Sequence, residues 1–296
     1  MNAPLLFPLP GNEASCGRLA AGLGAEVGDI EVRRFPDGES YVRYLSAPEQ
    51  RDIVLFCTLD RPDDKLLQLM FAAETARELG AASVGLVSPY LAYMRQDRRF
   101  NDGEAVTSAQ FAKLLSGAFG WLVTIDPHLH RYAALEEIYS VPSAVLHAAP
   151  LISQWIAAEV SRPLLIGPDG ESEQWVSSVA RAANAPFVVL GKTRRGDRDV
   201  EVSVPEVERW RDHTPVLVDD IVSTAHTMIE TVHHLRVAGM KPPVCIAIHA
   251  VFADDAYREL CATGIDRVVT ANTIAHPSNG IDVTSLLADG IRRIMG

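Results

Sequence analysis

The chain has 296 residues, of which 27 are basic and 38 are acidic, so its formal net charge is −11. Apolar residues make up 48% of the sequence and charged residues 22%, which is typical of globular proteins and excludes extensive disorder. The length suits one large domain or two domains of about 150 residues each. An isoelectric point near 5.3 argues against a protein that coats nucleic acid. Any phosphate site must therefore be a local basic cluster on an acidic chain.

Neither the cysteines nor the N-terminus point to secretion or to a membrane. The four cysteines lie far apart, with no C-x-x-C pair and no zinc-type spacing, and three fall in apolar stretches, so we expect buried, reduced thiols. The N-terminus lacks the basic segment of a signal peptide. The longest uncharged run, residues 138–158, contains prolines and polar side chains, which excludes a membrane-spanning helix. We expect a cytoplasmic protein with no membrane or nucleic-acid partner.

Apolar runs of strand length alternate with helical patterns along most of the chain. Residues 52–58 predict a buried strand, residues 64–80 an amphipathic helix that ends at glycine, and residues 83–88 a second strand. Such a βαβ unit implies parallel strands with helices on their faces, and ligands at the carboxyl ends of the strands. Similar apolar runs follow at residues 121–126, 163–168, 186–191, 215–219, 244–252 and 266–270.

No low-complexity linker divides the chain, but residues 139–150 lie near its midpoint and contain two prolines. Both halves hold several predicted strands and helices, so two similar α/β domains fit the length better than one sheet. We expect an N-terminal domain over residues 1–145 and a C-terminal domain over residues 146–296. The last helix is expected to pack back on the N-terminal domain.

The sharpest local feature lies at residues 215–236, where an apolar strand runs into Asp219 and Asp220, then a turn rich in Ser and Thr, then a helix. Hydroxyls and backbone N–H groups at a helix N-terminus bind phosphate, and the helix dipole strengthens the binding. The two carboxylates are suited to sugar hydroxyls or to Mg²⁺. The alternative is an acidic strand end in which Ser223 or Thr224 simply caps the helix.

This loop resembles the ribose-phosphate-binding loop of type I phosphoribosyltransferase-like proteins. The motifs at residues 9–13, 34–39, 88–100, 126–128 and 191–194, in this order, resemble those of ribose-phosphate pyrophosphokinases, also called phosphoribosyl-diphosphate (PRPP) synthetases. The resemblance covers essentially the whole chain. It implies an α/β fold made of two type I phosphoribosyltransferase-like domains in tandem, with parallel-rich sheets flanked by helices.

The resemblance also implies an activity and its partners. An enzyme of this kind is a ribose-phosphate diphosphokinase of nucleotide biosynthesis, a transferase that makes 5-phosphoribosyl 1-diphosphate and AMP from ATP and ribose 5-phosphate. Mg²⁺ is the metal that the resemblance implies. Because the ATP site in this family is shared between subunits, we expect a homo-oligomer, either a dimer or a hexamer.

The first motif expected to bind ATP lies on a turn formed by Pro36 and Gly38. Phe35 offers a ring on which adenine can stack, and Asp37 and Glu39 offer acceptors for its amine. The resemblance assigns Phe35, Asp37, Gly38 and Glu39 to the ATP site. Taken alone, a polar hairpin turn with a half-buried phenylalanine is the commoner structure.

The second motif expected to bind ATP holds three arginines within five positions, residues 95–99. Guanidinium groups bind phosphate oxygens and also stack on purines. The resemblance assigns ATP contact to Arg95 and Gln96, with Arg98 and Arg99 as further candidates. Without the resemblance, such a run is usually a solvated charged turn.

Two strand ends are expected to position the metal. The resemblance assigns His128, in an Asp-x-His element that begins at Asp126, to the ATP-bound metal. It assigns Asp169, which follows the predicted strand at residues 163–168, to metal or diphosphate positioning. Oxygen ligands dominate Mg²⁺ coordination, and zinc is disfavoured because no third soft ligand lies nearby. A hydrogen-bonded structural histidine and an Asx turn are the alternatives.

A basic stretch lies at residues 191–201, where four cationic side chains, Lys192, Arg194, Arg195 and Arg198, occur together with Gly191 and Gly196. We expect a mobile loop that closes over substrate. The resemblance makes Lys192 and Arg194 the catalytic pair, which neutralises charge as the diphosphoryl group is transferred. The alternative is a solvated surface loop.

One loop departs from the family pattern, because Thr-Gly-Gly-Thr is replaced by Thr-Ala-His-Thr. Ala225 costs little there if its φ is negative. His226 has three possible effects: it projects outward as the first residue of the helix, it donates a pH-dependent hydrogen bond to phosphate, or it weakens substrate binding. The ribose 5-phosphate site is expected to comprise Arg194, Asp219, Asp220, Ser223, Thr224, Ala225, His226 and Thr227.

Two other functions remain open at this point. Ala225 and His226 are compatible with a catalytically weak or regulatory homologue, whereas the presence of Lys192 and Arg194 argues against it. A phosphoribosyltransferase that consumes the same metabolite is the second alternative. The motif at residues 35–39 suits ATP better than a base acceptor and speaks against that alternative.

Overall fold

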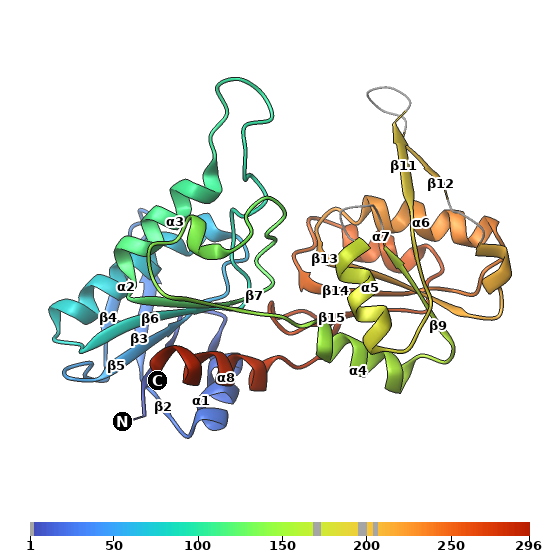
Figure 1. The fold of residues 1–296 in the computed structure, drawn as a ribbon. Helices are drawn as coiled ribbons and strands as arrows, with labels where there is room; N and C mark the ends of the chain where they lie inside the picture. Colours follow the sequence, from blue (N-terminus) through green and yellow to red (C-terminus); the bar gives the residue numbers. More distant parts are fainter. Residues whose placement is uncertain (1–2, 168–172, 195–199, 204–206) are drawn as a thin grey trace. The chain divides into compact units, whose positions relative to one another are not determined.

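The computed structural model describes residues 3–167, 173–194, 200–203 and 207–296. The chain divides into two compact units, the first formed by Met1–Leu146 with Thr284–Gly296 and the second by His147–Val283. Figure 1 traces both units along the chain. Each unit contains one six-stranded sheet and one separate two-stranded hairpin.

The sheet of the first unit is parallel throughout, with the strand order β2-β1-β5-β6-β7-β8. Its central strands are almost entirely buried, because helices cover both faces and leave no polar face to alternate with an apolar one. The strands are β1 (Leu5–Pro8), β2 (Glu26–Val27), β5 (Asp52–Phe56), β6 (Ser83–Ser88), β7 (Trp121–Ile125) and β8 (Ser143–Leu146).

Two helices cover each face of this sheet, as Figure 1 shows. The last helix reaches the sheet closely at Gly290, where a Cβ atom would lie 2.8 Å from the Leu146 side chain and 3.1 Å from Val123. Glycine therefore allows the C-terminal helix to pack beside the first helix of the chain. One face carries α1 (Glu13–Leu23) and α8 (Thr284–Met295), and the other carries α2 (Leu66–Glu78) and α3 (Thr107–Ala118).

The sheet of the second unit is also parallel, with the order β10-β9-β13-β14-β15-β16. The strands are β9 (Pro163–Gly167), β10 (Phe187–Val189), β13 (Thr214–Val222), β14 (Val244–Ala250), β15 (Arg267–Ala271) and β16 (Asn279–Ile281). The helices are α4 (Ala149–Glu159), α5 (Glu173–Ala182), α6 (His226–Val237) and α7 (Ala256–Ala262).

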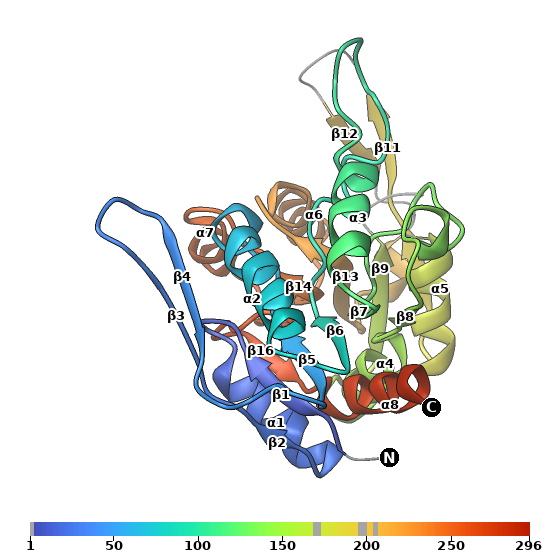
Figure 2. The same cartoon turned by 90° about the vertical axis from the view of Figure 1, so that its left-hand side faces the viewer.

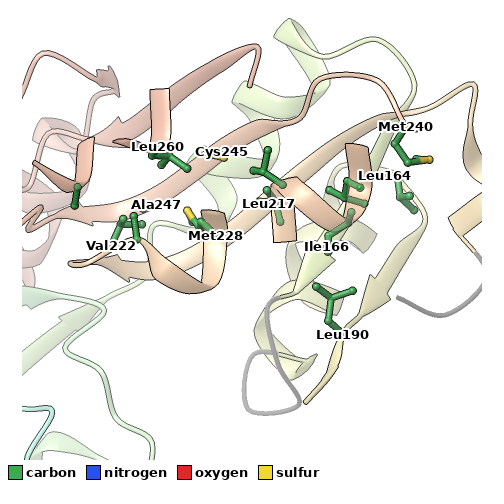
Figure 3. Close-up of a cluster of buried hydrophobic side chains, with 14 residues drawn as sticks. Leu164, Ile166, Leu190, Leu217, Val222, Met228, Met240, Cys245, Ala247 and Leu260 are labelled. Carbon is green, nitrogen blue, oxygen red and sulfur yellow. The ribbon is translucent and has the colours of Figure 1, made fainter. Parts of the chain in front are cut away.

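The core of the second unit packs one face of this sheet against α6 and α7. Figure 3 shows Leu217 of β13 and Ile166 of β9 among these side chains, with Met228 of α6 and Leu260 of α7 packed against the sheet. All four side chains are at most 3% exposed. Burial of several such side chains, at about 2 kcal/mol each, holds α6 and the loop before it against the sheet.

The two units repeat one topology that is not visible as sequence identity. In each, an antiparallel hairpin follows the second strand in chain order, and the chain then returns to the sheet. Figure 2 shows the hairpin of the first unit extending away from its sheet. The hairpin strands are β3 (Ile30–Arg34) and β4 (Ser40–Tyr44) in the first unit, and β11 (Gly191–Arg194) and β12 (Val200–Ser203) in the second.

The predicted fold class, two α/β domains with parallel sheets flanked by helices, is confirmed, with two local differences. Residues 191–194, expected in a loop, form β11 because they pair with β12. Asp219 and Asp220, expected where the strand ends, lie inside β13, because pairing with β14 continues to Val222. Three short 3-10 turns complete the described elements: η1 (Pro62–Asp64), η2 (Leu135–Glu137) and η4 (Val207–Trp210).

The cysteines match their predicted state. Cys16, Cys57 and Cys245 are buried, and only Cys261 is exposed. Burial raises the pKa of the Cys16 and Cys57 thiols to about 12, so both stay protonated at neutral pH. In the part of the chain that the structure describes, no helix has the length and apolar character needed to cross a membrane.

Candidate functional site

The β3–β4 hairpin of the first unit presents the Phe35 motif at its tip. The turn closes through hydrogen bonds from Phe35 N to Glu39 O (2.8 Å) and from Gly38 N to Phe35 O (2.9 Å). Gly38 has φ +95°, a conformation that favours glycine. The Asp37 carboxylate accepts the Glu39 N–H at 3.2 Å, which orders the turn. All these residues are exposed, so the tip can offer a ring and two carboxylates to a ligand.

The Phe35 ring already has neighbours on its own hairpin. The Arg33 guanidinium lies 4.8 Å from the Phe35 ring centroid and 4.1 Å from that of Tyr41. The two rings meet edge to face at 5.8 Å. Phe35 is nevertheless 40% exposed. A planar ligand can therefore stack on the exposed part of a ring that Arg33 and Tyr41 support.

The segment after β6 places Arg95 and Gln96 at the surface of the first unit. Met94 is 2% exposed and anchors the segment, whereas Arg95 is exposed. The Gln96 Oε1 atom accepts a hydrogen bond from the Thr107 hydroxyl at 3.1 Å. Thr107 is the first residue of α3, so that helix fixes the orientation of the Gln96 amide.

Asp97 joins this segment to the loop that follows β7. Its Oδ1 atom accepts from Arg131 Nε at 3.2 Å, and the Asp97 carboxylate is only 6% exposed. The Tyr132 hydroxyl lies 3.1 Å from the Ser108 hydroxyl and donates to the Asp97 carbonyl. The two predicted ATP- and metal-binding segments of the first unit are thereby held together.

Asp126 and His128 lie at the carboxyl end of β7, as predicted. Both have positive φ values, +37° and +54°, which are uncommon for residues other than glycine. The His128 ring lies 3.9 Å from the His130 ring, and the peptide N–H of His128 donates to the Asp126 carbonyl at 2.8 Å. The tight turn therefore gathers two imidazoles and a carboxylate at one strand end.

The basic stretch of the second unit lies on the β11–β12 hairpin. Lys192 pairs with Val202 and Arg194 with Val200. Both predicted catalytic residues thus belong to a paired strand rather than to an irregular loop. Asp169, predicted to position metal or diphosphate, lies outside the described residues.

The loop before α6 has the features of a phosphate site. No side chain among the described residues caps α6, so Ser223 and Thr224 do not act as the simple cap that was the alternative. Thr224 is exposed and Ser223 is half-buried. The first turn of α6 carries no acidic side chain. Backbone N–H groups at such a helix start can bind an anion, and the helix dipole favours its charge.

Asp219 and Asp220 precede this loop on β13. Asp219 Oδ1 accepts the Asp220 N–H at 2.9 Å, and Asp220 Oδ1 accepts the Ile221 N–H at 2.8 Å. Both residues are half-buried. The Ser223 carbonyl accepts the Ala253 N–H at 3.1 Å, so the loop after β14 supports the loop before α6. Two carboxylates near the end of β13 and the N-terminus of α6 are thus joined by one short loop of the second unit.

Ala225 and His226 are the two residues of this loop that depart from the family pattern, and the structure gives the backbone conformation of Ala225 and the position of His226. Ala225 has φ +57° and ψ +5°, the left-handed conformation, so the condition of a negative φ is not met. An alanine in that conformation costs roughly 1 kcal/mol relative to the right-handed one. His226 is exposed and is the first residue of α6, which fits the expectation that it projects outward from the start of the helix.

Sequence reasoning missed the side chains that support the predicted site. Thr107, Arg131 and Tyr132 hold Gln96 and Asp97, but they lie 11 to 35 positions from their partners. The only local signal is that Thr107 starts a helical pattern, which suggests a cap rather than a contact with Gln96.

Comparisons with known proteins identify the family and the fold. A family model described as the N-terminal domain of ribose phosphate pyrophosphokinase matches residues 5–118, and a phosphoribosyl transferase domain model matches residues 134–285. The crystal structure of phosphoribosylpyrophosphate synthetase from Mycobacterium smegmatis has a TM-score of 0.87 and 23% identity, and the match covers 99% of both chains. That likeness shows a shared fold.

Curated relatives match over nearly the full length. The ribose-phosphate pyrophosphokinase of Methanopyrus kandleri is 31% identical over 281 residues, which cover 94% of this chain and 95% of that protein. The ribose-phosphate pyrophosphokinase of Methanothermobacter thermautotrophicus is 32% identical over 261 residues, with 88% and 90% covered. The chain therefore belongs to the ribose-phosphate pyrophosphokinase family of enzymes.

Proposed function

We propose that this protein makes 5-phosphoribosyl 1-diphosphate and AMP from ATP and ribose 5-phosphate. The anomeric oxygen of ribose 5-phosphate attacks the β-phosphorus of ATP in line, the bond from that phosphorus to the AMP oxygen breaks, and AMP leaves. The observation that carries the proposal is the N-terminus of α6, which no described side chain caps and which follows Asp219 and Asp220 after a short loop, in a member of this family. A sugar phosphate needs both parts, one for its phosphate and one for its hydroxyls.

The residues of the first unit are proposed to bind ATP. Phe35 stacks on adenine, and Asp37 and Glu39 accept from its exocyclic amine, with Gly38 shaping the turn. Arg95 binds the polyphosphate, because an exposed guanidinium forms two parallel hydrogen bonds to phosphate oxygens. Gln96 contributes through the amide that Thr107 orients.

The residues of the second unit are proposed to bind ribose 5-phosphate. The phosphate accepts hydrogen bonds from the hydroxyls of Ser223, Thr224 and Thr227 and from backbone N–H groups of the loop that contains Ala225 and His226. Asp219 and Asp220 accept from the ribose hydroxyls, and this fixes the direction of the anomeric oxygen.

Lys192 and Arg194 are proposed as the catalytic residues. Negative charge is spread over the oxygens of the β-phosphoryl group as it passes from AMP to the sugar, and two cations on the β11–β12 hairpin stabilise that charge. Arg194 also contacts the ribose 5-phosphate. Because these interactions strengthen in the transition state, they raise turnover more than substrate affinity.

The donor set of the first unit fits Mg²⁺ only together with substrate. The end of β7 offers two imidazoles and one carboxylate, whereas Mg²⁺ prefers oxygen and is commonly held by one or two carboxylates plus substrate phosphates. We propose that His128 and Asp169 hold Mg²⁺ that arrives with ATP. When bound, the ion offsets the charge of the polyphosphate oxygens.

The assembly is proposed to be a cytoplasmic homo-oligomer, either a dimer or a hexamer, in which the ATP site is shared between subunits. The exposed tip of the β3–β4 hairpin supports this arrangement, because an adenine-binding ring at the end of an extended arm suits a ligand held by a neighbouring subunit.

The deciding experiment is a coupled assay for AMP formation with Mg-ATP, with and without ribose 5-phosphate. The proposal requires AMP that depends on ribose 5-phosphate, together with 5-phosphoribosyl 1-diphosphate in equal amount. Absence of AMP at high substrate concentration would overturn it. Release of diphosphate that depends on a nucleobase, without ATP, would instead indicate a phosphoribosyltransferase.

A further inference from the structure

Tyr93 has a backbone conformation that a bulky residue rarely adopts. Its φ is +63°, in the left-handed region, where a side chain with a Cβ atom is strained by about 1–2 kcal/mol. Tyr93 lies two residues before Arg95 and directly before the buried Met94. Strain of this kind persists only where surrounding contacts enforce it, and it is common at functional sites. Tyr93 lies in a turn that extends to Arg95, one of the proposed ATP-binding residues.

Two contacts hold Tyr93 in this conformation. Its hydroxyl donates a hydrogen bond to the Asp63 carboxylate in the η1 turn. Its ring packs on Phe111 of α3, with ring centroids 4.8 Å apart. The bond to Asp63 raises the pKa of the Tyr93 hydroxyl to about 12, so it remains a donor throughout the neutral range.

The same turn also contacts the β3–β4 hairpin next to its tip. Arg34, the residue before Phe35, donates from Nη2 to the Asp64 carbonyl at 3.0 Å and lies 3.5 Å from the Asp64 carboxylate. The ion pair itself is exposed and contributes little, about 0–1 kcal/mol. The bond to the carbonyl ties the hairpin to the backbone of η1.

The η1 turn is itself fixed to the sheet. Lys65, directly after the turn, donates from Nζ to the Thr58 carbonyl at 2.9 Å and pairs with Asp60. The Lys65 side chain is 22% exposed and the Asp60 side chain 29%, so this pair is shielded from solvent more than the Arg34–Asp64 pair is. One short segment, anchored at the end of β5, thus contacts both segments to which ATP binding is assigned.

We propose that the η1 turn positions the ATP site: through Asp63 it locks Tyr93 and thereby sets Arg95 and Gln96, and through Asp64 it sets the Phe35 hairpin. This inference rests on the proposed function, because it takes those residues to be the ATP site. Asp63, Tyr93 and Arg34 are positioning residues, which act through their neighbours and do not touch the reacting atoms.

The chain offers a matched control for removal of the Tyr93 hydroxyl. Ser83 and Asp52 pair at the amino ends of β6 and β5, where the Ser83 hydroxyl donates to the Asp52 carboxylate. Tyr93→Phe and Ser83→Ala each remove one hydroxyl–carboxylate bond between segments of the same two strands, at opposite ends. A purely structural role predicts the same effect for both.

The test measures the dissociation constant for ATP by calorimetry, together with KM and kcat for both substrates. Tyr93→Phe is expected to weaken ATP binding about 5–20-fold, as loss of a hydrogen bond to a charged partner does, with kcat and the KM for ribose 5-phosphate within about twofold. Ser83→Ala is expected to leave ATP binding unchanged. Asp63→Asn, which keeps an acceptor, should fall between wild type and Asp63→Ala.

A double-mutant cycle tests whether the two segments share one support. Arg34→Met and Tyr93→Phe remove contacts to the same turn, so their combined loss of ATP affinity should be smaller than the product of the single losses by at least about threefold. Equal ATP binding in Tyr93→Phe and Ser83→Ala would overturn the role of Asp63, and multiplicative losses would overturn the shared support. If wild type binds ATP but forms no AMP, the proposed function fails while these affinities still test the inference.

Discussion

The β5–α2 connection of the first unit and the β13–α6 connection of the second occupy the same place in one strand order, but their side chains differ. In the first, Asp63 and Asp64 stand in the η1 turn just before α2, and their partners are Tyr93 and Arg34. In the second, the hydroxyl residues Ser223 and Thr224 precede α6. Among the described residues, neither α2 nor α6 has an acidic side chain in its first turn or a side-chain cap. The two connections therefore differ in the residues just before the helix, which are two carboxylates and a lysine in the first unit and two hydroxyl residues followed by Ala225 in the second. A repeated backbone therefore does not imply a repeated site.

The hairpins differ in the same way. The β3–β4 tip carries a ring and carboxylates suited to a base, whereas β11 carries two cations suited to phosphate. Under the proposed function, the first hairpin would contact the adenine and the second would contact the phosphates.

The largest effect is expected on kcat, from a substitution in the β11–β12 hairpin. Lys192→Ala should lower kcat about 10²–10³-fold, because one charge that stabilises the transition state is lost, while the dissociation constant for ATP stays within about threefold. Phe35→Ala, in the β3–β4 hairpin, serves as the control and should show the reverse pattern, with weaker ATP binding and a smaller change in kcat. A Lys192→Ala variant that loses affinity and turnover equally would contradict the contrast between the hairpins.

The next largest effect is expected on stability, because close packing of β6 against β7 in the first sheet requires a glycine. A Cβ atom on Gly85 of β6 would lie 2.0 Å from the Trp121 ring of β7. Gly85→Ala should lower the free energy of unfolding by about 2–3 kcal/mol through overpacking, measured by denaturant titration. Gly117→Ala, on a helix where nothing lies within 4 Å of the added atom, should be neutral or stabilising. Similar stability of the two variants would contradict this packing.

The third prediction concerns a substitution that places a carboxylate before α6, as Asp63 and Asp64 stand before α2. Thr224→Asp places a carboxylate in the phosphate loop, on an exposed residue whose replacement leaves the core intact. Repulsion should raise the KM for ribose 5-phosphate at least about tenfold, with the KM for ATP unchanged. Thr224→Asn is the neutral control of the same shape. If the KM for ribose 5-phosphate rises equally in both variants, the cause is the lost hydroxyl rather than the added charge, and the prediction is contradicted.

The smallest effect is expected at Ala225. Relief of its left-handed strain by glycine is offset by loss of a buried methyl group, about 0.8 kcal/mol, and by the greater freedom of unfolded glycine. Ala225→Gly should therefore change the free energy of unfolding by less than about 1 kcal/mol and the KM for ribose 5-phosphate by less than about threefold. A tenfold gain in activity would instead show that the alanine impairs the enzyme.

Much of the fold could be predicted because the signals are local. The apolar runs at residues 52–58, 83–88 and 244–252 contain strands, since buried parallel strands are apolar on both faces. The turn at Phe35 was visible from Pro36 and Gly38. The order of the motifs sufficed to identify the family, which the comparisons then confirmed.

The amino-acid sequence by itself determined the α/β class and the segments to which we assign ligand binding, because periodicity and turn chemistry act over a few residues. Only the tertiary structure decided that Asp63 meets Tyr93, that Asp97 meets Arg131, and that residues 191–194 form a strand. It also decided the positive φ of Ala225, which packing of α6 imposes against local preference. The reason is that such contacts join residues about 30 positions apart and depend on how the sheet brings strand ends together.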